Sequence, residues 1–286
     1  MRSTQWTRND ESTVWLDYTQ DALNRQYDQA SLVPEIGSYM ARWAKASERF
    51  RRAHPPVTLR YGDDASAQVD VYPGRPDAPV HLHIHGGAWR AMHRRDCGFV
   101  ARGLSAKGAT IVVAGFPLVP HVRLPALVDH IRQACLFTLN HVAGAHPLYV
   151  SGHSSGAHLA SCLMDPDWQT DIDLDTERFG GFVLASGPYD LEPVRLSARN
   201  EYLDLSQDEA DRLSPVRRLN ATGPRVDVIW GDGELAEFKR QSRAFADKVA
   251  GRGSAHEVAG RNHFDIYSDF EDPTSAVITA ALAQMH

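Results

Sequence analysis

The fold is decided by one stretch of sequence, L-Y-V-S-G-H-S-S-G-A-H-L-A at residues 148–160, which holds the only G-x-S-x-G pattern among the 286 residues. Residues 148–151 have the character of a short buried strand, and the residues from Ser155 onward follow a helical pattern. A serine between two glycines at such a junction predicts a tight strand-to-helix turn that holds its side chain above a sheet. We therefore predict Ser154 as a nucleophile, with the backbone N–H of Ser155 beside it.

Outward from this stretch, short apolar runs alternate with longer amphipathic segments. The predicted strands are 80–84, 110–114, 148–151, 181–186, 226–230 and 255–258, and the predicted helices are 97–107, 125–142, a segment from 155, 236–250 and 274–285. A hairpin over 58–72 would add an antiparallel edge. This alternation predicts an α/β fold, in which a mostly parallel eight-stranded sheet carries helices on both faces.

Two regions fall outside this alternation. Residues 1–53 are rich in Trp, Tyr and Arg, with a helical pattern over 33–52, and residues 188–224 are inserted between two predicted strands. Insertions at the carboxyl edge of such sheets often cover an active site. We expect one domain over 1–286, with 1–53 as a helical arm and 188–224 as a small cap-like insertion; surface packing is the alternative for both.

Composition restricts the partners and the compartment. The sequence is 43% hydrophobic and 23% charged, and its formal net charge of -6 argues against a nucleic-acid binder. Cys97, Cys135 and Cys162 give neither a disulfide framework nor a C-x-x-C pair, which favours a reducing cytoplasm. We see no signal peptide and no membrane-spanning run. We expect a cytoplasmic protein with a small-molecule partner, and aromatic residues of the N-terminal arm would suit a homodimer.

A glycine-rich loop, H-G-G-A-W at residues 85–89, follows the predicted strand 80–84. Glycines let the backbone fold back, so that N–H groups face the space above Ser154. Together with the N–H of Ser155, the N–H groups of Gly86 and Gly87 would bind the oxyanion of a tetrahedral intermediate. We expect His85 to fix this loop by hydrogen bonding.

Three alternating histidines offer a different interpretation of the same strand. His81, His83 and His85 would share one strand face, as zinc ligands sometimes do. A sheet covered on both faces gives such ligands no open position and no carboxylate partner nearby. We therefore expect no metal at this strand.

The general base is predicted from its position in the chain. His263 lies in G-R-N-H-F at residues 260–264, directly after the last predicted strand. The order serine, acid, histidine along the chain agrees with this placement, and histidine is the side chain whose ordinary titration range suits proton transfer at neutral pH. His153 and His158 flank Ser154, and we expect them to support the loop or the packing.

The acid that orients His263 should follow the strand 226–230, within G-D-G-E-L-A-E at residues 231–237. Glu234 is our first choice because the acid normally lies a few residues beyond the strand end. Asp232 is the second choice. Glu237, at the start of the next helix, would instead interact with the helix dipole. Asp190, after the preceding strand, is a more distant alternative.

These residues resemble the kynurenine formamidase (arylformamidase) branch of the α/β-hydrolases, close to the carboxylesterases. The similar segments span nearly the whole chain: 26–28 with 32–34, 85–89, 152–160, 186–193, 237–238 with 240–242, and 262–265. Two positions depart from the family's pattern. Glu234 stands where aspartate is more frequent, and Ser155 replaces a more frequent alanine.

The resemblance implies hydrolysis of an N-formyl or related amide, or of a small ester, with no metal or organic cofactor. Ser154 would attack the carbonyl, His263 would pass the proton to the leaving group, and water would release the acyl group. An aromatic wall for an aryl substrate would consist of Trp89, Tyr27, Tyr189 and Phe264, with core packing as the alternative.

Three hypotheses follow: an arylformamidase-like amidase, a carboxylesterase of broad acyl range, and a ligand-binding receptor whose chemistry is vestigial. The complete set of serine, acid and histidine favours an enzyme.

Overall fold

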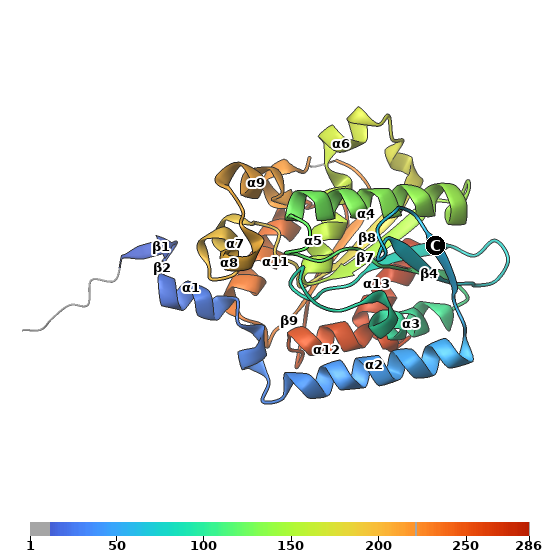
Figure 1. The fold of residues 1–286 in the computed structure, drawn as a ribbon, viewed down its shortest axis with the longest axis horizontal. Helices are drawn as coiled ribbons and strands as arrows, with labels where there is room; N and C mark the ends of the chain where they lie inside the picture. The colour runs from blue at the N-terminus through green and yellow to red at the C-terminus, as the bar shows by residue number, and fades with distance from the viewer. Residues whose placement is uncertain (1–11, 221, 286) are drawn as a thin grey trace, which may run out of the picture.

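The computed structural model describes residues 12–220 and 222–285, and its centre is a twisted sheet of eight strands (Figure 1). Across the sheet the strands lie in the order β10 (Ala255–Val258), β9 (Val226–Gly231), β8 (Phe179–Ala185), β7 (Leu148–His153), β5 (Val80–Ile84), β6 (Thr110–Ala114), β4 (Gln68–Tyr72) and β3 (Val57–Arg60). The six strands from β10 to β6 are parallel, whereas β4 and β3 pair antiparallel. The predicted mostly parallel sheet with an antiparallel edge is confirmed.

Helices cover both faces of this sheet (Figure 1). One face carries α4 (Leu124–Thr138), α5 (Ser155–Ser161) and α11 (Ala236–Lys248), and the other carries α2 (Ile36–Ala53), α3 (Ala101–Ser105), α12 (His263–Ser268) and α13 (Ala276–Gln284). Successive strand residues point to opposite faces. Leu184 of β8 therefore packs in one core and Val183 in the other. Burial on both faces explains why the strands are apolar runs rather than alternating patterns.

The predicted elements differ from the observed ones mainly at their ends. Strand β7 continues to His153, because its pairing with β8 extends to that residue. The helix predicted over 125–142 is α4 followed by a π-helical turn, Leu139–Ala143. The segment predicted as helix over 97–107 begins as the 3₁₀ helix η2 (Arg94–Val100) before α3.

Of the N-terminal residues 1–53, the structure describes 12–53, and these form two separate parts. Strands β1 (Thr13–Trp15) and β2 (Tyr18–Thr19), helix α1 (Gln20–Gln26) and a 3₁₀ turn, Gln29–Leu32, precede the long helix α2. Helix α1 lies beside the insertion: Gln20 Nε2 donates to Leu196 O at 2.8 Å, and the N–H of Ala198 donates to Asn24 Oδ1 at 2.8 Å. Helix α2 instead packs on the sheet.

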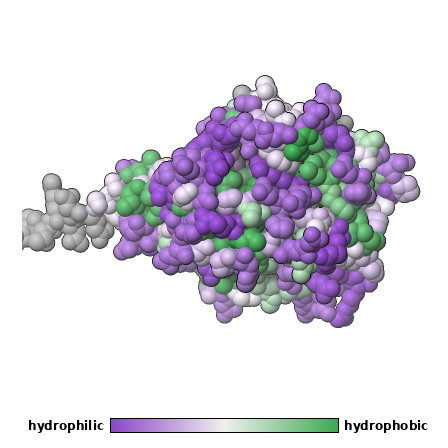
Figure 2. Space-filling view, turned by 45° about the horizontal axis from the view of Figure 1, so that its top comes forward, coloured by the Kyte–Doolittle hydropathy of each residue, from purple (hydrophilic) through white to green (hydrophobic). Residues whose placement is uncertain are grey.

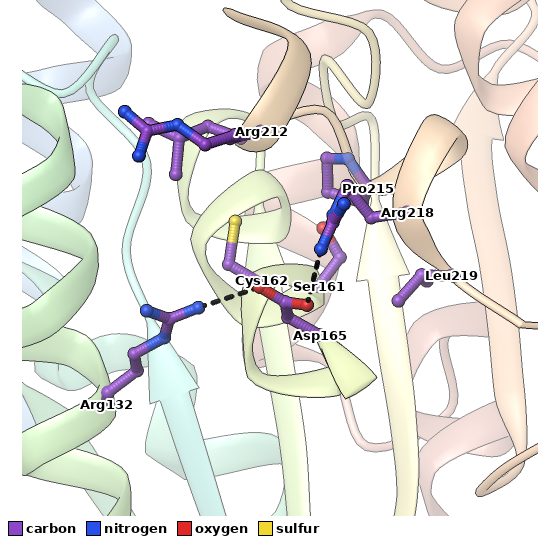
Figure 3. Close-up of a pocket in the computed structure, with 9 residues that line it drawn as sticks. Arg132, Ser161, Cys162, Asp165, Arg212, Pro215, Arg218 and Leu219 are labelled. Atoms are coloured by element: carbon purple, nitrogen blue, oxygen red, sulfur yellow. Dashed lines mark hydrogen bonds and ion pairs between the residues drawn. The ribbon is translucent and has the colours of Figure 1, made fainter. Parts of the chain in front are cut away.

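The insertion 188–224 consists of four short helices: α7 (Glu192–Leu196), α8 (Asn200–Leu203), α9 (Gln207–Arg212) and α10 (Pro215–Arg218). Figure 3 shows how its far end is anchored around a small pocket. Asp165, which caps α6 (Pro166–Asp171), pairs with Arg132 of α4 at 3.1 Å and with Arg218 at 3.7 Å. This anchor lies by Ser161 and Cys162, at the opposite end of α5 from Ser154.

Within the described ranges, no helix combines the length and the apolar character needed to cross a membrane.

Candidate active site

Ser154 lies in the turn between β7 and α5, in a backbone conformation that L residues rarely adopt, with φ 55° and ψ -127°. The turn is possible because two glycines let backbone segments touch. A Cβ on Gly152 would lie 2.2 Å from Gly156 O, and one on Gly156 would lie 2.1 Å from Ile84 O. The G-x-S-x-G spacing therefore has a steric cause here, and it presents the serine at the carboxyl edge of the sheet.

Three side chains from different loops form a continuous hydrogen-bonded chain at this edge. Ser154 Oγ lies 3.0 Å from His263 Nε2, and His263 Nδ1 lies 2.8 Å from Glu234 Oε2. All three residues are buried. His263 is the first residue of α12, whose start is fixed by a capping box between Asn262 and Asp265. The geometry is that of a nucleophile, a base and an orienting acid.

Glu234 is held by two further donors. The hydroxyl of Ser186 donates to Glu234 Oε1 at 2.5 Å, and the N–H of Gly231 donates to the same oxygen at 2.8 Å. Ser186 is fully buried and has a φ of 56°. Its support of the acid was not predicted. Its place directly after β8, next to the end of β9, is the signal that would have indicated it.

The other acidic candidates have different partners. Asp232 is exposed and accepts the N–H of Gly260 at 2.8 Å. Glu237 is buried in a pair with Arg240, and Asp190 pairs with Arg217. Of the four candidates, Glu234 is the one that the structure brings to His263.

The glycine-rich loop turns back over Ser154. Gly87, Ala88 and Trp89 all have positive φ values, of 108°, 52° and 60°. A Cβ on Gly86 would lie 3.2 Å from Ser154 Cβ, so this loop runs directly against the serine. The N–H of Trp89 donates to Ser155 Oγ at 3.1 Å, which ties the loop to the start of α5. The hydroxyl of Ser155, in place of a methyl group, thus has a structural use.

Three backbone N–H groups remain free at this point. The N–H groups of Gly86, Gly87 and Ser155 have no hydrogen-bond partner in residues 12–220 and 222–285. Free donors next to a serine hydroxyl are the arrangement that a developing oxyanion requires.

Two buried histidines hold the surrounding loops as neutral donors. Burial lowers the pKa of His85 to about 4, and its Nδ1–H donates to Gly86 O at 2.8 Å. Burial also holds the pKa of His153 well below its usual value, and its Nε2–H donates to the backbone oxygen of His263 at 2.9 Å. The hydrogen bond expected from His85 is present, and His153 links the serine loop to the base.

Two histidines of β5, His81 and His83, contact a serine. His81 Nε2 and His83 Nδ1 lie 2.7 and 2.9 Å from Ser151 Oγ, in the buried core. Burial lowers the pKa of His81 to about 3, so this group stays uncharged at neutral pH. In the part of the chain that the structure describes, no group of three or more His, Cys, Asp or Glu residues could hold a metal ion.

The four predicted aromatic wall residues are largely core residues. Trp89 and Tyr189 have no exposed surface, because Trp89 packs on His158 and Tyr189 stacks on Phe245 at 4.1 Å. Trp89 and Tyr189 are therefore core-packing residues, as the alternative expectation had it, and they cannot contact a substrate in this structure. Tyr27 and Phe264 keep only 5% and 7% exposure. Phe264 contacts the imidazole of His263, at 5.6 Å between rings.

A further aromatic residue, Phe238 of α11, was not predicted as part of the site. Its ring packs edge-on to His263 at 5.1 Å. It follows Glu237 at the start of the helix after β9, and a helical pattern alone gives no indication that this face meets the histidine loop.

Comparison with known proteins agrees with this architecture. The BD-FAE family model matches residues 70–182. The kynurenine formamidase of Danio rerio is 28% identical over 289 residues, covering 95% of this chain and 98% of the relative. An isoprenylcysteine α-carbonyl methylesterase of Arabidopsis thaliana is 22% identical, covering 76% of this chain and 57% of the relative.

Among solved structures, a protein from a Silicibacter species, named only provisionally as a thioesterase, is similar with a TM-score of 0.83 and 25% identity. The alignment covers 91% of this chain and 98% of that protein. The sequence and structural similarities agree over nearly the full length. The chain is a hydrolase with the α/β-hydrolase fold, and it is similar to the kynurenine formamidases and, more distantly, to the carboxylesterases.

Proposed function

We propose that this protein is a serine hydrolase that cleaves a small aryl formamide through an acyl-enzyme intermediate. The observation that carries the proposal is the hydrogen-bonded chain from Ser154 through His263 to Glu234, beside three free N–H groups. The similarity to kynurenine formamidases supports the formamide as the substrate class.

In the proposed mechanism, Ser154 Oγ attacks the formyl carbon while His263 Nε2 takes its proton. The N–H groups of Gly86, Gly87 and Ser155 stabilise the negative oxygen of the tetrahedral intermediate. Glu234 keeps His263 in the correct tautomer and stabilises the imidazolium. His263 then returns the proton to the leaving arylamine as the C–N bond breaks. Water, activated by the same histidine, releases formate and restores Ser154.

A carboxylesterase of broad acyl range is the alternative. The same groups would serve an ester, with an alkoxide as leaving group, and the similarity to methylesterases supports this possibility. Esters need less help in the departure of the leaving group, so weak ester turnover is expected even from a formamidase.

The insertion 188–224 and the residues before α2 are proposed as the substrate-facing wall. Their support is the pair of hydrogen bonds between α1 and the end of α7, at 2.8 Å each. The wall would restrict the acyl and aryl groups that reach Ser154.

A cytoplasmic location and a homodimer are the remaining proposals. The three cysteines are all buried free thiols, which suits a reducing compartment. Figure 2 shows a mostly hydrophilic face with a small hydrophobic group at the N-terminal hairpin, where Leu16 is 58% exposed. Light scattering of the purified full chain, with Leu16→Glu as the comparison, would test whether this hairpin joins two copies.

The substrate class is tested by comparing kcat/KM for N-formylkynurenine and for p-nitrophenyl acetate. We expect the formamide to be the better substrate, and we expect Ser154→Ala to remove both activities. Efficient ester turnover without formamide turnover would favour the carboxylesterase hypothesis over the formamidase hypothesis. Activity retained by Ser154→Ala would contradict the mechanism.

A further inference from the structure

Trp89, at the end of the glycine-rich loop, is fully buried and is held through its N–H, its carbonyl and its side chain. Its main-chain N–H donates to Ser155 Oγ at 3.1 Å, and its carbonyl oxygen accepts the N–H of Val119 at 2.9 Å. Its indole Nε1–H donates to His158 Nδ1 at 3.2 Å. Ser155 and His158 both belong to α5, the helix that begins directly after Ser154. The loop is therefore fastened to the helix that positions the candidate nucleophile.

The contact between Trp89 and His158 requires one particular tautomer of the imidazole. The indole N–H can only donate, so Nδ1 of His158 must carry a lone pair. The other ring nitrogen, Nε2, lies 2.8 Å from Leu213 O, which can only accept, so Nε2 must carry the proton. Cys162 Sγ lies farther from Nε2, at 3.7 Å. Leu213 lies in the insertion between α9 and α10, so a carbonyl of the insertion selects the tautomer that the loop needs.

A histidine at this buried position needs both of its hydrogen bonds. His158 has no exposed surface, and a polar group without a partner is costly in such a place. Burial lowers the pKa of His158 to about 4, so the ring is uncharged at neutral pH. The indole of Trp89 meets this ring edge-on, with 5.4 Å between the ring centroids. The bridge from Trp89 to Leu213 therefore explains the histidine better than packing alone, which an apolar ring would also provide.

The loop that this bridge holds has an unfavourable backbone conformation. Ala88 and Trp89 have φ values of 52° and 60°, which L residues keep only where their surroundings enforce them. The free N–H groups of Gly86 and Gly87 come directly before these two residues in the chain. Donors of an oxyanion hole act only within hydrogen-bond distance of the developing charge. A small displacement of Trp89 would therefore move the donors out of reach.

We propose that His158 is a positioning residue of the oxyanion hole. It ties Trp89 to α5, and with Trp89 it holds the N–H groups of Gly86 and Gly87 above Ser154. The insertion takes part through the carbonyl oxygen of Leu213, which fixes the ring. This inference rests on the proposed function, because it concerns how the proposed oxyanion hole is held in place.

The first test replaces each partner of the contact by phenylalanine. In His158→Phe and in Trp89→Phe we expect kcat for N-formylkynurenine and for p-nitrophenyl acetate to fall by about 10- to 100-fold, with KM within about 3-fold, because the oxyanion forms only during the reaction. His158→Gln should recover most of kcat, since an amide offers one acceptor and one donor. Ser161→Ala is the matched control: it removes a buried hydrogen bond of the same helix, to His158 O, and should leave kcat unchanged.

The double variant separates positioning from folding. Each single variant leaves a buried polar group without its partner, whereas the double variant replaces both partners by apolar rings. Its midpoint of urea unfolding should therefore lie above that of His158→Phe. Its kcat should stay as low as that of the less active single variant, because both substitutions remove the same contact.

Recovery of kcat together with the unfolding midpoint would show that the contact serves folding alone, and this would overturn the proposal. An additive loss of kcat in the double variant, a loss confined to KM, no recovery in His158→Gln, or an equal loss in Ser161→Ala would also overturn it.

The proposed function can fail separately from this inference. A wild-type enzyme that hydrolyses only the ester excludes the formamidase, and the ester kinetics then decide the role of His158. If neither substrate is hydrolysed, the rate at which a fluorophosphonate labels Ser154 takes the place of kcat, since phosphonylation also places a negative oxygen in the hole. His158→Phe and Trp89→Phe must then slow the labelling, and Ser161→Ala must not. A wild-type protein that is not labelled either would overturn the role of His158 together with the mechanism.

Discussion

The carboxyl edge of the sheet and the wall beside it are built in different ways. At the edge, Ser154, Glu234 and His263 each follow directly after a strand or a strand-terminal turn, so the sheet itself brings them together. In the wall, Tyr27 and Arg199 meet across 172 positions of sequence through loops and short helices. Under the proposed function, the sheet would set the chemistry of this protein, whereas its selectivity would depend on long-range contacts between irregular segments.

If the carboxyl edge of the sheet controls the chemistry, substitution of its acid, Glu234, should have the largest effect on kcat. We expect Glu234→Gln to lower kcat by about 10³- to 10⁴-fold with little change in KM, because the amide cannot stabilise the imidazolium. Asp232→Asn is the matched control, since this residue only accepts the N–H of Gly260, and its kcat should stay within about 3-fold. Steady-state kinetics of both variants decide between the two acids; a large loss in Asp232→Asn would exclude Glu234.

Lowering the pH should destabilise the sheet and its core more than the wall. Burial lowers the pKa of His81 to about 3 and that of His85 and His158 to about 4. Below about pH 6.5 these histidines therefore bind protons in the unfolded chain but not in the folded one. The free energy of unfolding then falls by up to ~1.4 kcal/mol for each histidine and each pH unit. This stability is fully present above pH 6.5 and decreases toward pH 4.

Urea unfolding at several pH values measures this loss. A midpoint that is the same at pH 7.5 and pH 5 would contradict neutral buried histidines. Residues 188–224 contain no histidine, so local exchange of wall amides should depend less on pH than the global midpoint.

Substitution of Ser186, at the same edge of the sheet, should lower kcat less than substitution of Glu234. We expect Ser186→Ala to lower kcat by about 10- to 100-fold, because Glu234 loses one of the donors that position it. The pH profile of kcat should also move, which a merely destabilised variant would not show. Ser214→Ala is the control, since Ser214 is an equally buried serine of the insertion. Equal kinetics for the two variants would mean that Ser186 is only a packing residue.

A substitution in the wall should have the smallest effect, and this effect should be mainly on KM. Asn24→Ala removes the acceptor for the N–H of Ala198 and loosens α1 from the insertion. We expect KM to rise about 2- to 5-fold at constant kcat, in line with the loss of one partly exposed hydrogen bond. Asn220→Ala, at the exposed end of the insertion, is the control. A change in kcat rather than in KM would contradict the division between chemistry at the sheet edge and selectivity at the wall.

The sequence allowed most of the sheet and the candidate triad to be predicted, because both depend on local patterns. The strand–turn–helix around Ser154 and the position of His263 after the last strand need no knowledge of distant contacts. Glu234 was chosen by its distance from a strand end, and the structure brings it to His263. The segment 188–224 was recognised as an insertion, but its contacts could not be predicted.

What could not be predicted depends on side chains that meet from far apart in the chain. Trp89 and Tyr189 have the residue type of a substrate wall, yet both are fully buried, since aromatic residues serve cores as often as sites. Phe238 belongs to a segment that resembles the family, but that resemblance does not reveal its contact with His263, and Arg199 lies in none of the similar segments. Their proximity to His263 and Tyr27 appears only when the helices are placed on the sheet.

Covalent labelling tests directly whether Ser154 is the nucleophile at the carboxyl edge of the sheet. The full-length wild-type protein is incubated with a fluorophosphonate, its intact mass is measured, and the modified peptide is sequenced. We expect one added phosphonyl group, located on Ser154, and none in Ser154→Ala or after denaturation. An unlabelled wild-type protein would favour a ligand-binding protein on a hydrolase fold, and a label on any other residue would exclude Ser154 as the nucleophile.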